Sequence, residues 1–210
     1  MTADPRTRLV GDGYDAIGDR FVAWRDEIVD DPRRWWAEQL ESRLADGDRV
    51  LELGCGAGVP DTQLLAARFR VTGVDISAEQ VRRARANVPG AAFIHADFTA
   101  LELEPASFEG VAAFYSFNHV PRDLLASVFS RIHSWLIPGG CFLVALGTSD
   151  DPGWTGDWLG TTMFFSSFPP QTNRRLLAEA GFELLLDEVV TTRDPEPDGE
   201  GDWHWVLARR

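Results

Sequence analysis

The sequence has only two cysteines, Cys55 and Cys141, in 210 residues. Two cysteines at unrelated positions form neither a disulfide framework nor a metal-binding motif, so we interpret them as reduced core residues of a cytoplasmic protein. No run approaches the roughly 18 apolar residues that a membrane-spanning helix requires. The first 15 residues are polar and lack the apolar segment of a secretory signal. We therefore do not expect a secreted protein or a membrane partner.

Basic residues are the minority charge, with 20 Lys and Arg against 33 Asp and Glu and a net charge of −13. Proteins that bind nucleic acids usually gather basic side chains into a patch that displaces counterions from phosphates. Here the densest basic group is Arg82, Arg83 and Arg85, on what we interpret as the polar, solvated face of a helix. The charge pattern indicates no nucleic-acid partner, and a small molecule becomes the expected one.

Hydrophobic residues make up 44% of the chain and aromatic residues 11%, which suffices for one domain with a full core. We expect a single domain over residues 1–210. Its parts are an N-terminal helical lid (1–45), a cofactor-binding core (46–147) and a final part that holds an acceptor-pocket loop, a helix and a closing hairpin (148–210).

The first 45 residues predict two helices. Tyr14, Ile17, Phe21, Trp24 and Ile28 recur at three- and four-residue spacing, which makes one apolar stripe. The Asp-Pro pair at 31–32 predicts the end of that helix and the start of a second one.

After residue 45 the pattern changes to short strands that alternate with helices, which predicts a parallel sheet covered by helices on both faces. A capping box at 77–80, in which Ser77 and Gln80 satisfy each other's free amides, begins one helix. A Pro- and Gly-rich segment near 194–202 separates two strand-like runs and predicts a closing antiparallel hairpin. The expected strands are 49–54, 71–75, 92–96, 111–115, 142–146, 182–192 and 203–208, and the expected helices after the lid are 78–87, 122–136 and 172–180.

The sharpest local signal is the turn ELGCGAG at 52–58, between a strand and a helix. Glycines there allow a tight turn and let a ligand approach the backbone. A dinucleotide site requires a third glycine at the position of Val59, so the spacing argues against a nicotinamide cofactor.

Two acidic residues follow at the same predicted sheet edge. Asp75 ends a strand about 20 residues after the glycines, where a carboxylate can accept hydrogen bonds from ribose hydroxyls. Asp97, followed by Phe98, ends the next strand, where a carboxylate can accept from an adenine amine. Ligands of open α/β sheets bind at this edge.

Together these residues resemble the class I, Rossmann-like S-adenosylmethionine-dependent methyltransferases. The run LELGCGAG at 51–58 is similar to the first motif of that family, VDIS at 74–77 to the second and ADF at 96–98 to the third. The run LIPGG at 136–140 is similar to the turn before the fifth strand.

The resemblance implies an α/β fold with a doubly wound, three-layer, seven-stranded sheet, mainly parallel, whose final strand is antiparallel. It also implies methyl transfer from S-adenosylmethionine to a small molecule. By this resemblance Gly54, Cys55 and Gly56 lie under the methionine part of the cofactor, Asp75 holds the ribose, and Ile76 packs on the adenine. The other cofactor-binding candidates are Asp97 and Phe98 at the adenine edge, Tyr14 as a lid residue, Gln80 and Tyr115.

The segment after the fourth predicted strand, residues 115–121, should lie at the mouth of the pocket. His119 is the candidate general base, because imidazole titrates near neutrality. His95 and His133 are expected to be structural, and His204 is expected to be exposed or to face the sheet. No cluster has the spacing of metal ligands. Core packing is the default interpretation of the aromatic segment near 154–168, although these side chains are also candidates to line the acceptor pocket: Trp154, Trp158, Met163, Phe164, Phe165 and Phe168.

Two alternatives stay open at this point. One is a nicotinamide-dependent oxidoreductase, which Val59 and the lack of a Tyr-x-x-x-Lys pair disfavour. The other is a member of the fold that binds cofactor without catalysis, which the intact glycines and acidic residues disfavour. The sequence identifies neither the acceptor atom nor the oligomeric state.

Overall fold

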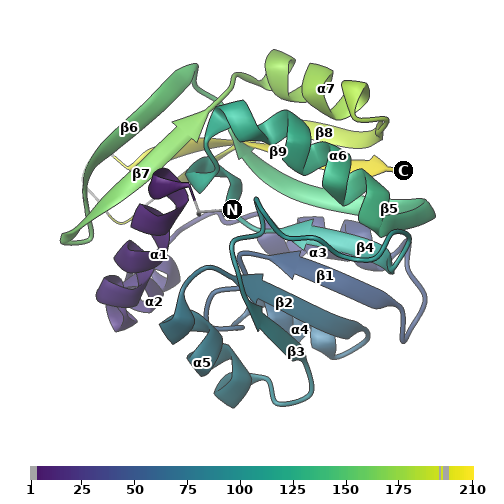
Figure 1. Ribbon diagram of the computed structural model, residues 1–210, viewed down its shortest axis with the longest axis horizontal. Helices are drawn as coiled ribbons and strands as arrows, with labels where there is room; N and C mark the ends of the chain where they lie inside the picture. The colour runs from purple at the N-terminus through teal and green to yellow at the C-terminus, as the bar shows by residue number, and fades with distance from the viewer. Residues whose placement is uncertain (1–3, 194, 196–198) are drawn as a thin grey trace.

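The computed structural model describes residues 4–193, 195 and 199–210. Its main sheet has seven strands in the order β3-β2-β1-β4-β5-β9-β8, which confirms the predicted mainly parallel sheet (Figure 1). Only β9 runs antiparallel to its neighbours, β5 and β8. The strands are β1 (Arg49–Leu53), β2 (Arg70–Asp75), β3 (Ala92–His95), β4 (Phe108–Ala113), β5 (Leu136–Gly147), β8 (Glu183–Arg193) and β9 (Glu200–Arg209).

Helices cover both faces of this sheet, which confirms the three layers. On one face, α6 (Leu125–Trp135) and α7 (Pro170–Glu179) bury their apolar stripes in a core that includes Phe129 and Phe142. On the other face, α3 (Arg33–Glu41) and α4 (Asp61–Ala66) pack through Trp36 and Leu65. The helix α5 (Ala78–Asn87) follows β2, and two short 3₁₀ helices, η1 (Phe117–His119) and η2 (Arg122–Leu124), connect β4 to α6. Each crossover returns the chain so that the carboxyl ends of β1, β2 and β4 meet at one edge.

The N-terminal segment forms three helices rather than the predicted two: α1 (Pro5–Ile17), α2 (Asp19–Asp26) and α3. The apolar stripe that predicted one continuous helix is interrupted at Gly18, whose φ of 56° and ψ of −125° lie outside helical values. Because glycine adopts positive φ at little cost, the chain turns there and α2 takes a new direction. The stripe shows which side chains are apolar but not where the helix breaks.

Residues 151–167 form an antiparallel hairpin of β6 (Asp151–Trp158) and β7 (Thr161–Ser167), where the sequence indicated a loop. Its two-residue turn has positive φ at Leu159 (51°) and Gly160 (75°), the backbone typical of a type I′ turn. An irregularity between Asp151 and Trp154 breaks the alternation that would have predicted a strand. The hairpin packs against α1, and the two elements lie together beside the edge where the parallel strands end (Figure 1).

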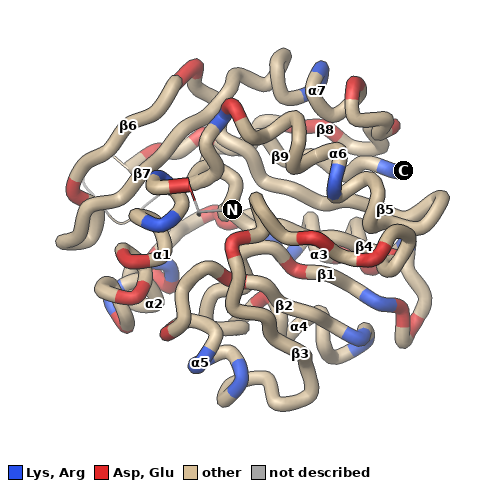
Figure 2. The backbone as a smooth tube through the Cα atoms, viewed as in Figure 1, with Lys and Arg blue, Asp and Glu red and all other residues tan. Residues whose placement is uncertain are grey.

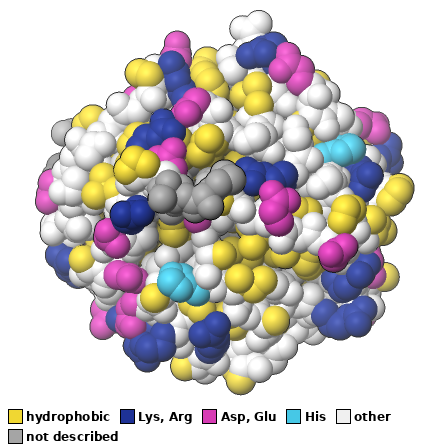
Figure 3. Space-filling model, viewed as in Figure 1, with side chains coloured by type: hydrophobic (Ala, Val, Ile, Leu, Met, Phe, Trp, Pro, Cys, Tyr) yellow, Lys and Arg dark blue, Asp and Glu magenta, His cyan; other side chains and the backbone are white. Residues whose placement is uncertain are grey.

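Charged residues are distributed over all parts of the backbone rather than gathered on one element (Figure 2). On the face shown in Figure 3, hydrophobic side chains are interspersed with charged and polar ones. No helix in the described part of the chain is long and apolar enough to cross a membrane.

Candidate functional site

A cavity lies at the carboxyl ends of β1, β2 and β4, under α1, α2 and the end of β6. Ten of the eleven residues predicted for the site line it: Tyr14, Gly54, Cys55, Gly56, Asp75, Ile76, Gln80, Phe98, Tyr115 and His119. The exception is Asp97. These residues come from six segments: α1, the turn after β1, the end of β2, α5, the turn after β3 and the segment after β4. The fold therefore brings together motifs that are far apart in the sequence.

The glycine turn after β1 lies at the floor of this cavity. Gly54 has φ of 76° and Gly56 has φ of 52°, a region that favours glycine. A Cβ atom on Gly54 would lie 2.3 Å from the Cβ of Ser116, so this position also allows β1 and the segment after β4 to approach closely. The turn therefore requires glycine for both conformation and space.

Asp75 fixes this turn to the end of β2. Its two carboxylate oxygens accept hydrogen bonds from the backbone N–H groups of Gly56 (2.8 Å) and Ser77 (2.9 Å). Burial raises the pKa of Asp75, while these two hydrogen bonds act in the opposite direction. Each oxygen keeps acceptor capacity beyond its one backbone partner, so the carboxylate can still bind hydroxyl groups in the cavity.

Gln80 shows that half of the predicted capping box is wrong. The hydroxyl of Ser77 accepts from the N–H of Gln80 (3.1 Å), as predicted. The reciprocal bond is absent, because the N–H of Ser77 already donates to Asp75. Both polar atoms of the Gln80 side chain are buried in the cavity wall without a partner, although the residue is only 1% exposed. A buried amide without partners costs about 1–3 kcal/mol, so this side chain is suited to bind a ligand.

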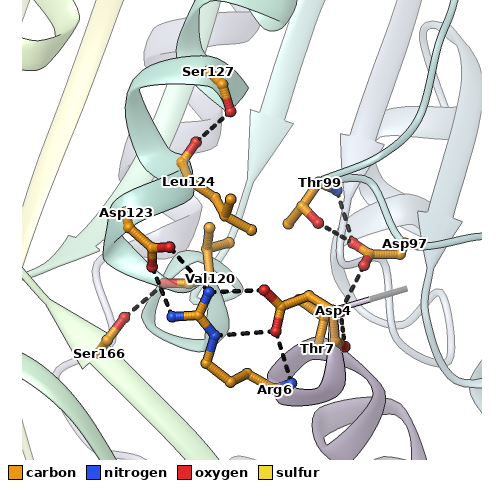
Figure 4. Close-up of polar contacts among 10 residues, drawn as sticks. All are labelled: Asp4, Arg6, Thr7, Asp97, Thr99, Val120, Asp123, Leu124, Ser127 and Ser166. Atoms are coloured by element: carbon orange, nitrogen blue, oxygen red, sulfur yellow. Dashed lines mark hydrogen bonds and ion pairs between the residues drawn. The ribbon is translucent and has the colours of Figure 1, made fainter. Parts of the chain in front are cut away.

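Asp97 does not line the cavity, and its side chain holds the start of α1 (Figure 4). One carboxylate oxygen accepts from the N–H (2.8 Å) and hydroxyl (2.6 Å) of Thr99, and the other accepts from the hydroxyl of Thr7 (2.7 Å). Nearby, Arg6 pairs with Asp123 of η2 (2.7 Å). The hydrogen bond that Asp97 would accept from an adenine amine stays a prediction, whereas Thr7 and Thr99 line the cavity themselves.

His119 is fully enclosed and bonded at both ring nitrogens. Its Nδ1 lies 2.8 Å from the carbonyl oxygen of Phe164, and its Nε2 lies 2.9 Å from the hydroxyl of Tyr14. Because a carbonyl only accepts, Nδ1 carries the proton, and in the neutral ring Nε2 accepts from Tyr14. Burial lowers the pKa of His119 to about 4. Burial also raises the pKa of Tyr14, so the pair is a neutral imidazole that accepts from a neutral phenol.

A buried ion network that the sequence did not predict lies beside Tyr115. Arg33 contacts Asp31 (2.6 Å) and Asp61 (2.9 Å), and its guanidinium carbon lies 5.0 Å from the centre of the Tyr115 ring. The hydroxyl of Tyr115 donates to Asp31 (2.7 Å). Burial alone would lower the pKa of Arg33, but Asp61 and Asp31 raise it above its usual value. Arg33 and Asp61 line the cavity. The Asp-Pro-Arg sequence at 31–33 gave no signal beyond a helix boundary.

Of the six residues proposed for the acceptor pocket, only Trp158 lines the cavity. Met163 and Phe164 are buried in the core between the hairpin and α1, and Phe165 packs against that core. Phe168 packs on the main core, and Trp154 is 47% exposed. The remaining apolar wall comes from residues that were not predicted to lie there, among them Phe21, Trp24 and Trp203.

The other three histidines lie outside the cavity lining. His204, expected to be exposed or to face the sheet, is fully buried and pairs with Asp187 (2.8 Å). The Nε2 of His95 lies 3.0 Å from the carbonyl oxygen of Ile76, and the ring of His133 packs edge-on against Phe182. Both cysteines are buried and unpaired.

Known proteins resemble this chain in sequence and in fold. A methyltransferase-domain family matches residues 50–140. A sterol 24-C-methyltransferase of Gibberella zeae is 30% identical over 78% of this chain and 46% of its own length. A trans-aconitate 2-methyltransferase of Rhodopseudomonas palustris is 40% identical over 49% of this chain and 40% of its own length. The chain spans about half the length, or less, of these curated relatives.

A solved structure agrees over the whole chain. It is the 1,6-didemethyltoxoflavin-N1-methyltransferase of Burkholderia thailandensis, with bound 1,6-didemethyltoxoflavin and S-adenosylhomocysteine. Its TM-score is 0.73 at 24% identity, and the match covers 100% of this chain and 92% of the other. At this identity the likeness shows the fold, and the sequence relatives add the family. The chain therefore belongs to the class I, Rossmann-like S-adenosylmethionine-dependent methyltransferase family.

Proposed function

We propose that this protein transfers a methyl group from S-adenosylmethionine to a small-molecule acceptor. One observation carries the proposal. Two groups lie in the cavity wall beside the glycine turn: the side-chain amide of Gln80, which has no hydrogen-bond partner, and the carboxylate of Asp75. These groups suit a nucleoside: a carboxylate for ribose hydroxyls, a buried amide for further polar atoms, and a backbone without side chains that a ligand can approach.

The residues around the cavity fit this cofactor. Asp75 and Gln80 would hold its polar groups, and Ile76 and Phe98 would pack against the adenine. When bound, the cofactor supplies an activated methyl group on sulfur, so the protein has mainly to align the acceptor and exclude water. The lid formed by α1, α2 and the hairpin supplies that exclusion.

Proton removal is assigned to His119, with Tyr14 between its Nε2 and the cavity. Because the imidazole is neutral, its Nε2 lone pair is available to take a proton, and the Phe164 carbonyl can stabilise the resulting cation at Nδ1. A low pKa makes this imidazole a weak base, so it serves acceptors that lose their proton readily in the transition state.

Three further points support the proposal over its alternatives. Val59 occupies the position where a dinucleotide site requires glycine, which disfavours a nicotinamide cofactor. The orphaned Gln80 amide supports a bound ligand, and the Tyr14–His119 pair in the same cavity wall favours catalysis over a member of the fold that binds cofactor without it. The unpaired thiols suit the reducing cytoplasm.

Replacing Asp75 by alanine should weaken S-adenosylmethionine binding tenfold or more, because each charge-assisted hydrogen bond contributes about 1.5–3 kcal/mol. Calorimetric titration with S-adenosylmethionine, S-adenosylhomocysteine and NAD measures this. Asp46→Ala, which removes a carboxylate that is 79% exposed, serves as the control and should bind normally. Equal affinity for the cofactor in a folded Asp75→Ala variant, or tighter binding of NAD, would contradict the proposal.

Ligand binding should also slow hydrogen exchange across residues 10–30. The helix α2 has no buried residue of its own, yet Phe21, Val22, Trp24 and Arg25 line the cavity, so a bound ligand supplies the packing that α2 lacks. Exchange measured by mass spectrometry with and without S-adenosylhomocysteine tests this, with β5 as an internal control whose protection should not change. Identical exchange of α2 in both states would show that the helix is a fixed part of the scaffold.

A further inference from the structure

The acceptor side of the cavity is walled by aromatic rings. The ring of Tyr14 lies edge-on to Phe21, with centroids 5.2 Å apart, and Trp24 lies edge-on to Trp158 at 5.3 Å. The rings of Tyr14 and Trp158 are also edge-on, with centroids 5.9 Å apart. All four residues line the cavity, and they come from α1, α2 and β6, away from the glycine turn. We call these four residues the aromatic box.

Each charged side chain in the described cavity wall already has a protein partner. Arg33 pairs with Asp31 and Asp61. Arg25 pairs with Asp26 and donates to the carbonyl oxygen of Val59. The oxygens of Asp75 accept from two backbone N–H groups. The wall thus offers no uncommitted cation to a carboxylate.

The Tyr14–His119 pair is neutral, so it too offers no charge that would bind a carboxylate. The phenol donates to Nε2, and Nδ1 donates to Phe164, so neither group presents a fixed charge to the cavity. An anionic acceptor would lose its hydration among rings and neutral groups, which costs several kcal/mol without a partner cation from the protein. An uncharged ring loses little water and gains edge and face contacts with the box.

From these observations we infer that the acceptor is a flat, ring-containing molecule without a carboxylate or other anionic group, which carries its reactive O–H or N–H toward Tyr14 and His119. The inference rests on the proposed methyl transfer and narrows its substrate class. In the reaction the acceptor heteroatom bonds to the methyl carbon as the carbon–sulfur bond breaks with its electron pair left on sulfur. The acceptor proton goes to the oxygen of Tyr14 while the proton of Tyr14 goes to Nε2 of His119. Carboxylate acceptors, such as the one named for the trans-aconitate relative, do not suit this wall.

Matched probe molecules test the inference by calorimetry on the wild-type protein saturated with S-adenosylhomocysteine. We expect 2-naphthol to bind at least tenfold more tightly than 6-hydroxy-2-naphthoate, which adds only a carboxylate. Equal or tighter binding of the naphthoate, or no binding of 2-naphthol, overturns the inference.

Substitution of two tryptophans of β6, Trp158 and Trp154, tests where 2-naphthol binds. Trp158→Ala should weaken 2-naphthol binding at least fivefold and leave S-adenosylhomocysteine binding unchanged, because Trp158 belongs to the aromatic box. Trp154→Ala is the control, since Trp154 is 47% exposed and lies outside the cavity wall. Equal loss in both variants overturns the location.

Failure of the wild-type protein to bind S-adenosylhomocysteine overturns the proposed function and this inference together. Normal binding of S-adenosylhomocysteine with a preference for the naphthoate overturns the inference alone.

Discussion

Replacing Arg33 by methionine should lower the free energy of unfolding by about 3–5 kcal/mol, the usual cost of breaking a buried ion pair from one side. The Arg33 side chain is 11% exposed, and its partners Asp31 and Asp61 are 20% and 15% exposed. Methionine fills a similar volume, so the loss comes from two carboxylates left without their cation rather than from a cavity. Urea denaturation at neutral pH, followed by tryptophan fluorescence, measures the change.

The neighbouring arginine is a matched control for this experiment. Arg34 pairs with Glu38 on the same helix, but both side chains are about half exposed. Exposed pairs contribute little, so Arg34→Met should change the unfolding free energy by less than about 1 kcal/mol. Unfolding midpoints that agree between the two variants would show that the Arg33 network does not stabilise the fold.

Acidification should destabilise the wild-type protein more than a His119→Gln variant, by about 3 kcal/mol in all between pH 6.5 and pH 4. Burial lowers the pKa of folded His119 to about 4, whereas the unfolded chain titrates near 6.5. Between these values the unfolded state binds more protons, so stability falls as pH falls and the loss is complete near pH 4. Above pH 6.5 the histidine adds no pH dependence.

Glutamine suits this comparison because its amide can donate to Phe164 and accept from Tyr14 without titrating. The buried Asp75 and Asp61 have raised pKa values and act in the opposite sense, but they are common to both proteins and cancel in the difference. Denaturant titrations at several pH values measure the two curves. Parallel curves for the two proteins would show that the imidazole titrates normally and is open to water. Once an acceptor is known, low turnover of a stable His119→Gln variant would identify the base.

The part of the site that we propose for the cofactor was predictable because its signals are local. The glycine turn, Asp75 and Phe98 each follow directly from a strand, and a parallel sheet brings strand ends together whatever the loops do. The closing hairpin was predictable for a similar reason, since two β-rich runs flank one turn-forming segment. Residues 194 and 196–198 of that segment lie outside the described residues.

The rest of the site was not predictable, because it depends on contacts between distant segments. Thr7 and Asp97 are 90 residues apart, and nothing near Asp97 indicated that a helix start would take its second oxygen. By resemblance Tyr14 was expected as a lid residue that binds the cofactor, yet its hydroxyl contacts His119, 105 residues away. The β6–β7 hairpin was missed because its bulge and its Leu159–Gly160 turn hide the two-residue period.

The hairpin and the first two helices have a consequence for how such a protein diversifies. The matched domain covers residues 50–140, and both segments that build the aromatic box lie outside it, one before and one after. Substitutions in either segment can reshape the box without touching Gly54, Asp75 or the strands that hold them. We therefore expect that the choice of acceptor can change while cofactor binding stays the same. A hairpin transplanted from another member of the family would be expected to bring new selectivity into a chain that keeps its own methyl donor.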